Sequence, residues 1–314
     1  GGFMIFSSAS LGLLAREGAS FASVAFSQFV FGILGGGTAL LITSNIYYRN
    51  WRRFAFYIFL ATFLLTALVF TPLGMSHGGA TRWLDLGITT LQPSEFLKIG
   101  FIIYLATWFS GTYGNITSWK HGLLPFISIT AVTGLIMLLQ PDTDTFLIMG
   151  AAGMAMFMVA GAKWRDIGLI LAGAFLMLVV LAVFRPYVMD RFTTFLNPDS
   201  DPTGSGYQIQ QSLIAVGSGG FTGRGFGQSI QKFEYLPEPI GDSIFAVYAE
   251  EFGFLGAIVL IGALMSLAMR GYKIANQSAD IFGTLLVTGF ITLIITQAFL
   301  NIAAMVGVAP LSGL

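Results

Sequence analysis

Residues 167–184 read IGLILAGAFLMLVVLAVF, an apolar run without a charged side chain. A helix needs about 20 such residues to cross the hydrocarbon core of a bilayer. Similar runs recur along the 314 residues, of which 55% are hydrophobic and only 10% are charged, and the mean hydropathy is +0.79. Because soluble domains carry roughly 25% charged residues, we predict an all-α polytopic membrane protein. Intrinsic disorder, a disulfide scaffold and a nucleic-acid binder are excluded.

The apolar runs predict about nine membrane helices. Their approximate ranges are 1–9, 24–46, 54–71, 94–110, 122–140, 144–162, 167–184, 243–269 and 281–305. A long polar stretch, 185–242, separates the last two helices from the others and is expected to form one large loop. We expect a single membrane domain over 1–314, in a chain that lacks the N-terminal part of its first helix and everything beyond its ninth.

Lysine and arginine indicate the orientation, because short cytoplasmic loops are enriched in these bases. Four short loops share the enrichment: 47–53, 111–121, 163–166 and 270–280. Their bases are Arg49, Arg52, Arg53, Lys120, Lys163, Arg165, Arg270 and Lys273, against the acids Asp166 and Asp280. We therefore place these loops in the cytoplasm. The connections that face outward are 72–93, 140–144 and 185–242.

Polar residues near or inside a membrane segment are costly and are therefore candidates for function. Glu95 and Lys98 stand at i and i+3 of the helix 94–110, so they share a face. Either they form an ion pair that positions the helix, or Lys98 lines a polar cavity that accepts an anionic headgroup. Arg82 and Trp83, in the preceding loop, are either anchors at the membrane interface or part of the same site.

Two more outward-facing stretches carry polar groups. Asp144 is expected to cap the helix 144–162, and the alternative for Asp142 and Asp144 is contact with a cation, for which two acids alone are a weak signal. The glycine-rich run 217–227 lacks the spacing of nucleotide-binding loops. It is either a flexible loop or a cradle in which backbone amides and Arg224 hold phosphate oxygens.

Asp242 lies at the outer end of the helix 243–269, where as an N-cap it would satisfy the first amides. Glu250 follows eight residues later, roughly 12 Å further along a helix. Glu250 and Glu251 point in different directions, so at least one of them is expected to face the interior of the bundle. Both a proton relay and structural hydrogen bonds are open for these two acids.

In this order, the polar groups resemble the SEDS family of cell-shape and division proteins. The matching text is GATRWLDLG at 79–87, QPSE at 92–95, QPD at 140–142, GYQ at 206–208, AVGSGG at 215–220, LPE at 236–238, Asp242, and EEFG at 250–253. The stretch SIQK at 229–232 is more similar to the FtsW branch than to RodA. One departure is that the family usually reads His-Thr-Asp-Phe where this chain has Ile240-Gly241-Asp242-Ser243.

The resemblance implies a bundle of ten membrane helices and a peptidoglycan glycosyltransferase. Such an enzyme polymerises lipid II, an undecaprenyl-diphosphate-linked disaccharide peptide, on the outer face of the bacterial cytoplasmic membrane. Its implied partners are a class B penicillin-binding protein and other divisome or elongasome membrane proteins. The family's catalytic aspartate corresponds to Asp242.

The residues fit this chemistry, because a single inverting displacement needs one carboxylate base, unlike the paired acids of glycoside hydrolases. Cations must hold the departing diphosphate, and the candidates are Arg82, Lys98, Arg224 and Lys232. The other substrate-binding candidates are Trp83, Glu95, Gln211 and Glu238, and the secondary acids are Asp142, Asp144 and Glu250. A divalent cation shared by the carboxylates stays open, and no other cofactor is implied.

Two other functions remain as alternatives: a transporter that flips the lipid-linked precursor, and a non-catalytic division scaffold. A transporter needs polar residues in the cytoplasmic half as well. Those found there are few, namely Asn276, Gln277, Asp280 and Gln297. The clustering of polar groups on the outer side favours a surface enzyme.

Overall fold

The computed structural model describes residues 28–77, 80–85, 87, 90–184, 186–201, 204–237, 239 and 241–310. Helices occupy the predicted membrane segments within these residues, and the predicted segment 1–9 lies outside them. These helices are α3 (Gly36–Asn45), α4 (Arg49–Ala67), α5 (Pro93–Gly111), α6 (Leu124–Leu139), α7 (Thr143–Val159), α8 (Trp164–Phe184), α12 (Ile244–Asn276) and α13 (Ile281–Met305). The prediction of an all-α polytopic architecture is confirmed.

Five described helical spans are long and apolar enough to cross a membrane: Arg49–Phe70, Trp119–Leu139, Trp164–Phe184, Ile244–Asn276 and Ile281–Met305. The chain is therefore a multi-pass membrane protein. The described part of the chain yields fewer such spans than the predicted nine. The reason is that α3 and α7 are short, and Glu95 and Lys98 lower the hydropathy of α5.

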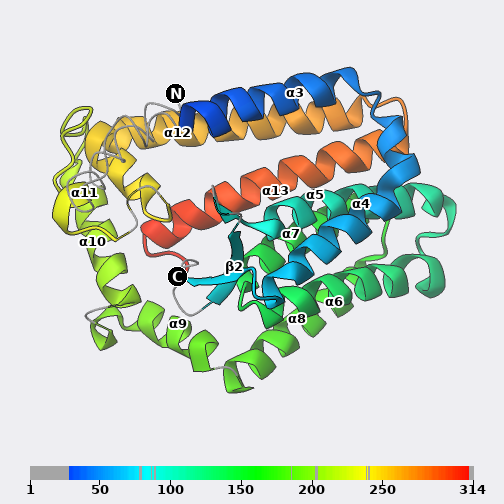
Figure 1. Ribbon diagram of the computed structural model, residues 1–314, viewed down its shortest axis with the longest axis horizontal. Coiled ribbons are helices and arrows are strands. Elements are labelled where there is room, and N and C mark those ends of the chain that lie inside the picture. The colour runs from blue at the N-terminus through cyan, green and yellow to red at the C-terminus, as the bar shows by residue number, and fades with distance from the viewer. Residues whose placement is uncertain are drawn as a thin grey trace. The chain divides into compact units, whose positions relative to one another are not determined.

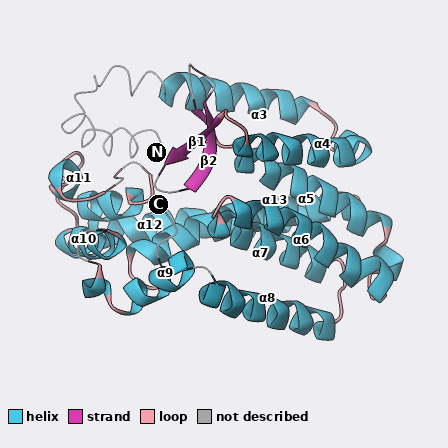
Figure 2. Cartoon of the chain, turned by 60° about the horizontal axis from the view of Figure 1, so that its bottom comes forward, coloured by secondary structure: helices cyan, strands magenta, loops and turns pink. Residues whose placement is uncertain are grey.

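Two of the connections that are predicted to face outward contain more regular structure than expected. Residues 72–93 include an antiparallel sheet, ordered β1 (Gly74–His77), β2 (Ala80–Asp85) and β3 (Thr90–Leu91), which appears in magenta in Figure 2. The stretch 185–242 is not an irregular loop. Much of it is helical, in α9 (Pro186–Leu196), α10 (Ser205–Ser218) and the single turn α11 (Gln231–Glu234).

The chain forms two compact units. The first, called the Asp242 unit, contains the described parts of residues 1–46, 179–265 and 298–313. The second, called the Lys98 unit, contains residues 47–178, where described, and 266–297. The single membrane domain over 1–314 stays a prediction.

Close helix packing builds the core of the Lys98 unit, in which α4 lies against α5 and α5 against α7 (Figure 1). A Cβ atom on Gly100 of α5 would lie within 2.3 Å of the Thr62 hydroxyl of α4, so glycine permits this contact. The rings of Phe109, Phe126 and Phe157 are fully buried, with centroids 5.1 to 6.0 Å apart. These ring contacts pack α5, α6 and α7 together near the C-terminal end of α5.

A break in α12 shapes the Asp242 unit. Gly253 has φ 64° and ψ −164°, which interrupts the helix at a conformation that glycine adopts without a steric penalty. Before the break, α12 packs on α10 and the end of α13 through a core that includes Ile209, Phe245 and Met305. The sequence predicted one helix over 243–269. The structure instead interrupts this helix at Gly253.

Candidate functional site

Asp242 stands on a stretch of main chain that hydrogen bonds fix from two sides. The Asn301 side chain of α13 donates to the Asp242 carbonyl oxygen at 2.8 Å. The next residue, Ser243, is fully buried, donates from its hydroxyl to the Pro237 carbonyl at 2.8 Å and accepts from Gln208 Nε2 at 3.1 Å. Since α12 begins at Ile244, Ser243 and not Asp242 immediately precedes the helix, so the N-cap interpretation of Asp242 is not supported.

The glycine-rich run supplies the backbone hydrogen bonds that α12 loses at its break. In a regular helix the carbonyls of Glu250 and Glu251 would accept from the amides of Phe254 and Leu255. Here the Glu250 carbonyl accepts from Arg224 N at 3.0 Å, and the Glu251 carbonyl accepts from Gly225 N at 2.9 Å. The displaced amides of Phe254 and Leu255 donate to the carbonyls of residues 220 and 221 at 3.0 and 3.1 Å.

This exchange decides between the two interpretations of residues 217–227. The amides of Arg224 and Gly225 are bound to helix carbonyls, so these amides do not cradle a phosphate. Gly223 has φ +82°, and a Cβ there would lie 2.1 Å from the Glu251 carbonyl oxygen. Residues 220–225 of the run are therefore hydrogen-bonded to α12, which argues against a flexible loop and against a phosphate cradle built from the amides of Arg224 and Gly225.

Glu250 is a fully buried acceptor for the segment that leads into α11. Its carboxylate accepts from the Ser229 hydroxyl at 2.5 Å and from the amides of Ile230 and Gln231 at 3.1 and 3.3 Å. Arg224 Nε lies 3.3 Å from the same carboxylate, and the Arg224 side chain is 38% exposed. Of the two roles predicted for Glu250, this geometry supports structural hydrogen bonds.

Lys232 forms a second buried contact with α12. Its ammonium lies 2.7 Å from Glu251 Oε1 and donates to the Gly227 carbonyl at 3.0 Å. Both side chains are almost fully inaccessible, at 0% and 1% exposure. The expectation that Lys232 holds a diphosphate is corrected, because its charge is enclosed and paired within the protein.

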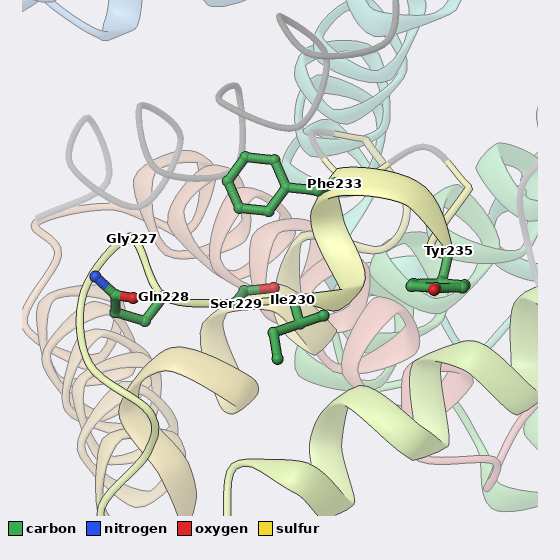
Figure 3. A pocket seen from close by; sticks show the side chains of 6 residues that line it. All are labelled: Gly227, Gln228, Ser229, Ile230, Phe233 and Tyr235. Atoms are coloured by element: carbon green, nitrogen blue, oxygen red, sulfur yellow. The ribbon is translucent and has the colours of Figure 1, made fainter.

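A shallow pocket of about 270 Å³ adjoins these contacts. Its walls are Gly227, Gln228, Ser229, Ile230, Phe233 and Tyr235. Figure 3 shows Gln228, Ser229 and Ile230 along the extended stretch before α11, and Phe233 and Tyr235 on and just after its turn. None of these side chains carries a formal charge at neutral pH, so the pocket offers no ion pair to a diphosphate.

In the Lys98 unit, the predicted pair of Glu95 and Lys98 is present. Lys98 is only 3% exposed, and its Nζ lies 2.7 Å from Glu95 Oε2 and 3.0 Å from Gln297 Oε1. Glu95 is 49% exposed, so the pair joins a buried cation to an accessible carboxylate. Gln297 was expected in the cytoplasmic half, which is wrong, because it meets Lys98 near the first turn of α5.

The sheet places Arg82 against the turn between α6 and α7. Ala80, Arg82 and Leu84 alternate onto the buried face of β2, and Arg82 Nη2 donates to the Pro141 carbonyl at 2.5 Å. Trp83 points to the opposite face and is 37% exposed. The Nε of Arg82 is buried and has no hydrogen-bond partner in the described part of the chain.

Asp142, and not Asp144, caps α7. Its carboxylate accepts from Thr145 N at 3.3 Å, and the residue is 3% exposed. The expected position of the cap was wrong by two residues, because α7 begins at Thr143. The second carboxylate oxygen, Oδ2, is buried without a hydrogen-bond partner among the described residues.

Two substrate-binding candidates, Gln211 and Glu238, remain to be placed. Gln211 lies half-buried on α10, whereas Glu238 falls outside the described residues. No three histidine, cysteine or acidic residues of the described chain lie close enough together to hold a metal ion. Sequence reasoning did not single out Asn301 or Ser243, although an asparagine in the apolar segment 281–305 is a recognisable signal.

Comparisons with known proteins agree on one family. The family described as cell cycle protein, FtsW/RodA/SpoVE, matches residues 1–314. Stage V sporulation protein E of Bacillus subtilis is 40% identical over 283 residues, which cover 89% of this chain and 76% of that protein. A probable peptidoglycan glycosyltransferase FtsW of Trichlorobacter lovleyi is 38% identical over 290 residues, 91% of this chain and 75% of that protein.

A solved structure described as "Structural coordination of polymerization and crosslinking by a peptidoglycan synthase complex" has the same fold. The TM-score is 0.77 at 26% identity, and the match covers 99% of this chain and 88% of that chain.

Proposed function

From the premise that this chain belongs to the FtsW/RodA/SpoVE family of cell cycle proteins, we propose that it is a peptidoglycan glycosyltransferase that polymerises lipid II. The resemblance seen in the sequence is thereby confirmed at the level of the family. Relatives named as probable peptidoglycan glycosyltransferases FtsW, at 36 to 38% identity, support the activity and the FtsW branch.

The observation that carries the mechanism is the fixed main chain at Asp242. Asn301 binds its carbonyl, and Ser243 is held by Gln208 and Pro237. A general base must be held within hydrogen-bond reach of the proton it removes. In the proposed step, Asp242 takes the proton of an acceptor hydroxyl as that oxygen attacks the anomeric carbon, and the bond to the undecaprenyl diphosphate breaks.

The departing diphosphate needs positive charge, and the candidate in the same unit as Asp242 is Arg224, whereas Arg82 and Lys98 belong to the Lys98 unit and stay predictions. Arg224 supports this role by its 38% exposed side chain. Lys232 leaves this set, since its charge is neutralised by Glu251.

The proposed location is the bacterial cytoplasmic membrane, with the site on its outer face. The excess of bases in the opposite loops supports this orientation. Because the chain has no cysteine, single cysteines can report the orientation without background. A membrane-impermeant thiol reagent applied to intact cells should label Gln228→Cys and not Lys120→Cys, and the reverse pattern would overturn the assignment.

The proposed partner is a class B penicillin-binding protein, and the similarity to a chain of a peptidoglycan synthase complex supports it. The activity itself is tested by incubating the purified protein and this partner with lipid II. Glycan chains are the expected product. Movement of lipid II across vesicles without polymer would favour the transporter, and neither result would favour the scaffold.

A further inference from the structure

We propose that Glu250 and Glu251 are positioning residues, which hold α11 against α12 and thereby fix the segment that carries Asp242. This inference rests on the proposed function, since it assigns a role to two residues that do not touch the reacting atoms. Together with Lys232 and Ser229, the two glutamates are called the α11 clamp.

The clamp determines where α11 lies. A helix of four residues is far too short to be stable alone, so its position depends on tertiary contacts. Glu250 binds the start of α11 through Ser229 Oγ and the amides of Ile230 and Gln231. Glu251 binds its second residue, Lys232, at 2.7 Å.

The chain then runs from α11 to Asp242 over a short distance. Leu236 is fully buried in the core with Phe245 and Met305. One residue later, the Pro237 carbonyl accepts from the Ser243 hydroxyl. Leu236 and Pro237 are therefore anchored just after α11, and Pro237 is bound to Ser243, which immediately precedes α12, the helix that carries the clamp.

This arrangement separates positioning from substrate binding. A catalytic group displaced by about 1 Å can lose on the order of 10²-fold in rate. The clamp side chains are enclosed, with exposures of 0% for Glu250 and 2% for Glu251, so they do not contact the substrate directly. Loosening the clamp should consequently lower kcat and leave KM for lipid II nearly unchanged.

The test compares kcat, KM and amide hydrogen exchange of the full chain with its partner. We expect Glu250→Gln and Glu251→Met to lower kcat by on the order of 10²-fold, with KM within about twofold. Exchange should accelerate in residues 229–237. The double variant Lys232→Met/Glu251→Met, which removes both charges together, should recover most of the lost kcat.

A matched control is Asp199→Ala, which removes an exposed hydrogen bond donated by Gln210 Nε2 in the same unit. It should keep the wild-type kcat. The proposal is overturned if Glu250→Gln accelerates exchange in 229–237 but keeps full kcat, or if activity falls only in proportion to the folded fraction. Failure of the wild-type protein to polymerise lipid II would instead overturn the proposed function, and the positioning role with it.

Discussion

The buried pair of Lys232 and Glu251 gives a quantitative prediction about stability. Its atoms are 2.7 Å apart, and both side chains are at most 1% exposed. Replacing one partner leaves an uncompensated buried charge, which costs about 3–5 kcal/mol. Replacing both with apolar residues of similar volume is often nearly neutral, apart from the Gly227 carbonyl that loses its donor at a cost of about 1 kcal/mol.

We therefore expect Lys232→Met to lower the free energy of unfolding by about 3–5 kcal/mol, and Lys232→Met/Glu251→Met to recover at least about 2 kcal/mol of that loss. The assay is equilibrium unfolding of the purified protein in detergent micelles. Arg49→Met serves as the control, because the side chains of Arg49 and Asp280 are 49% and 27% exposed in their pair and such surface pairs contribute about 0–1 kcal/mol. A double variant less stable than either single variant would refute the reasoning.

Three further predictions concern local structure. Gly223→Ala should destabilise the glycine-rich run by about 1–3 kcal/mol, because an αL residue there also meets a backbone oxygen; faster amide exchange of residues 219–227 is the measurement, and unchanged exchange would contradict it. Asp142→Ala should cost α7 about 0.5–2 kcal/mol as a lost cap, seen as a lower unfolding midpoint, whereas Asp144→Ala should cost less. Burial raises the pKa of Asp201, but hydrogen bonds from Gly204, Ser205 and Gly206 outweigh it and lower the pKa overall. Its stabilisation is thus present above the unfolded pKa of about 3.9 and is lost as the pH falls through the lower folded value. Amide exchange of residues 204–208 should therefore accelerate in acid, and Asp201→Asn should remove that dependence.

Helix positions were predictable, because an apolar run such as 167–184 can satisfy its own backbone hydrogen bonds in a bilayer by forming a helix. The break at Gly253 was not predictable from hydropathy, since a glycine in an apolar run is common in membrane helices. The break exists because residues 220–225 supply the hydrogen bonds that the helix gives up. Such compensation arises between segments that are distant in the sequence.

For the candidate site residues too, local contacts could be predicted and contacts between distant segments could not. The pair of Glu95 and Lys98 followed from i,i+3 spacing on one helix. The partner of Lys232, Glu251, lies on α12, beyond the reach of any local rule, so from the sequence Lys232 was expected to hold a diphosphate. The cap of α7 was predicted as a type but misplaced by two residues, because helix ends depend on local hydrogen bonds more than on hydropathy.

The account's central claim is that the Asp242 carboxylate removes the proton of the acceptor hydroxyl. The most direct measurement is the single-turnover rate of glycan formation from lipid II by Asp242→Asn, with the unfolding midpoint of the same preparation as its control. The account predicts a midpoint like that of the wild type and a rate lower by about 10²–10⁴-fold, the usual contribution of a general base. A correctly folded Asp242→Asn protein that forms glycan at the wild-type rate would contradict it.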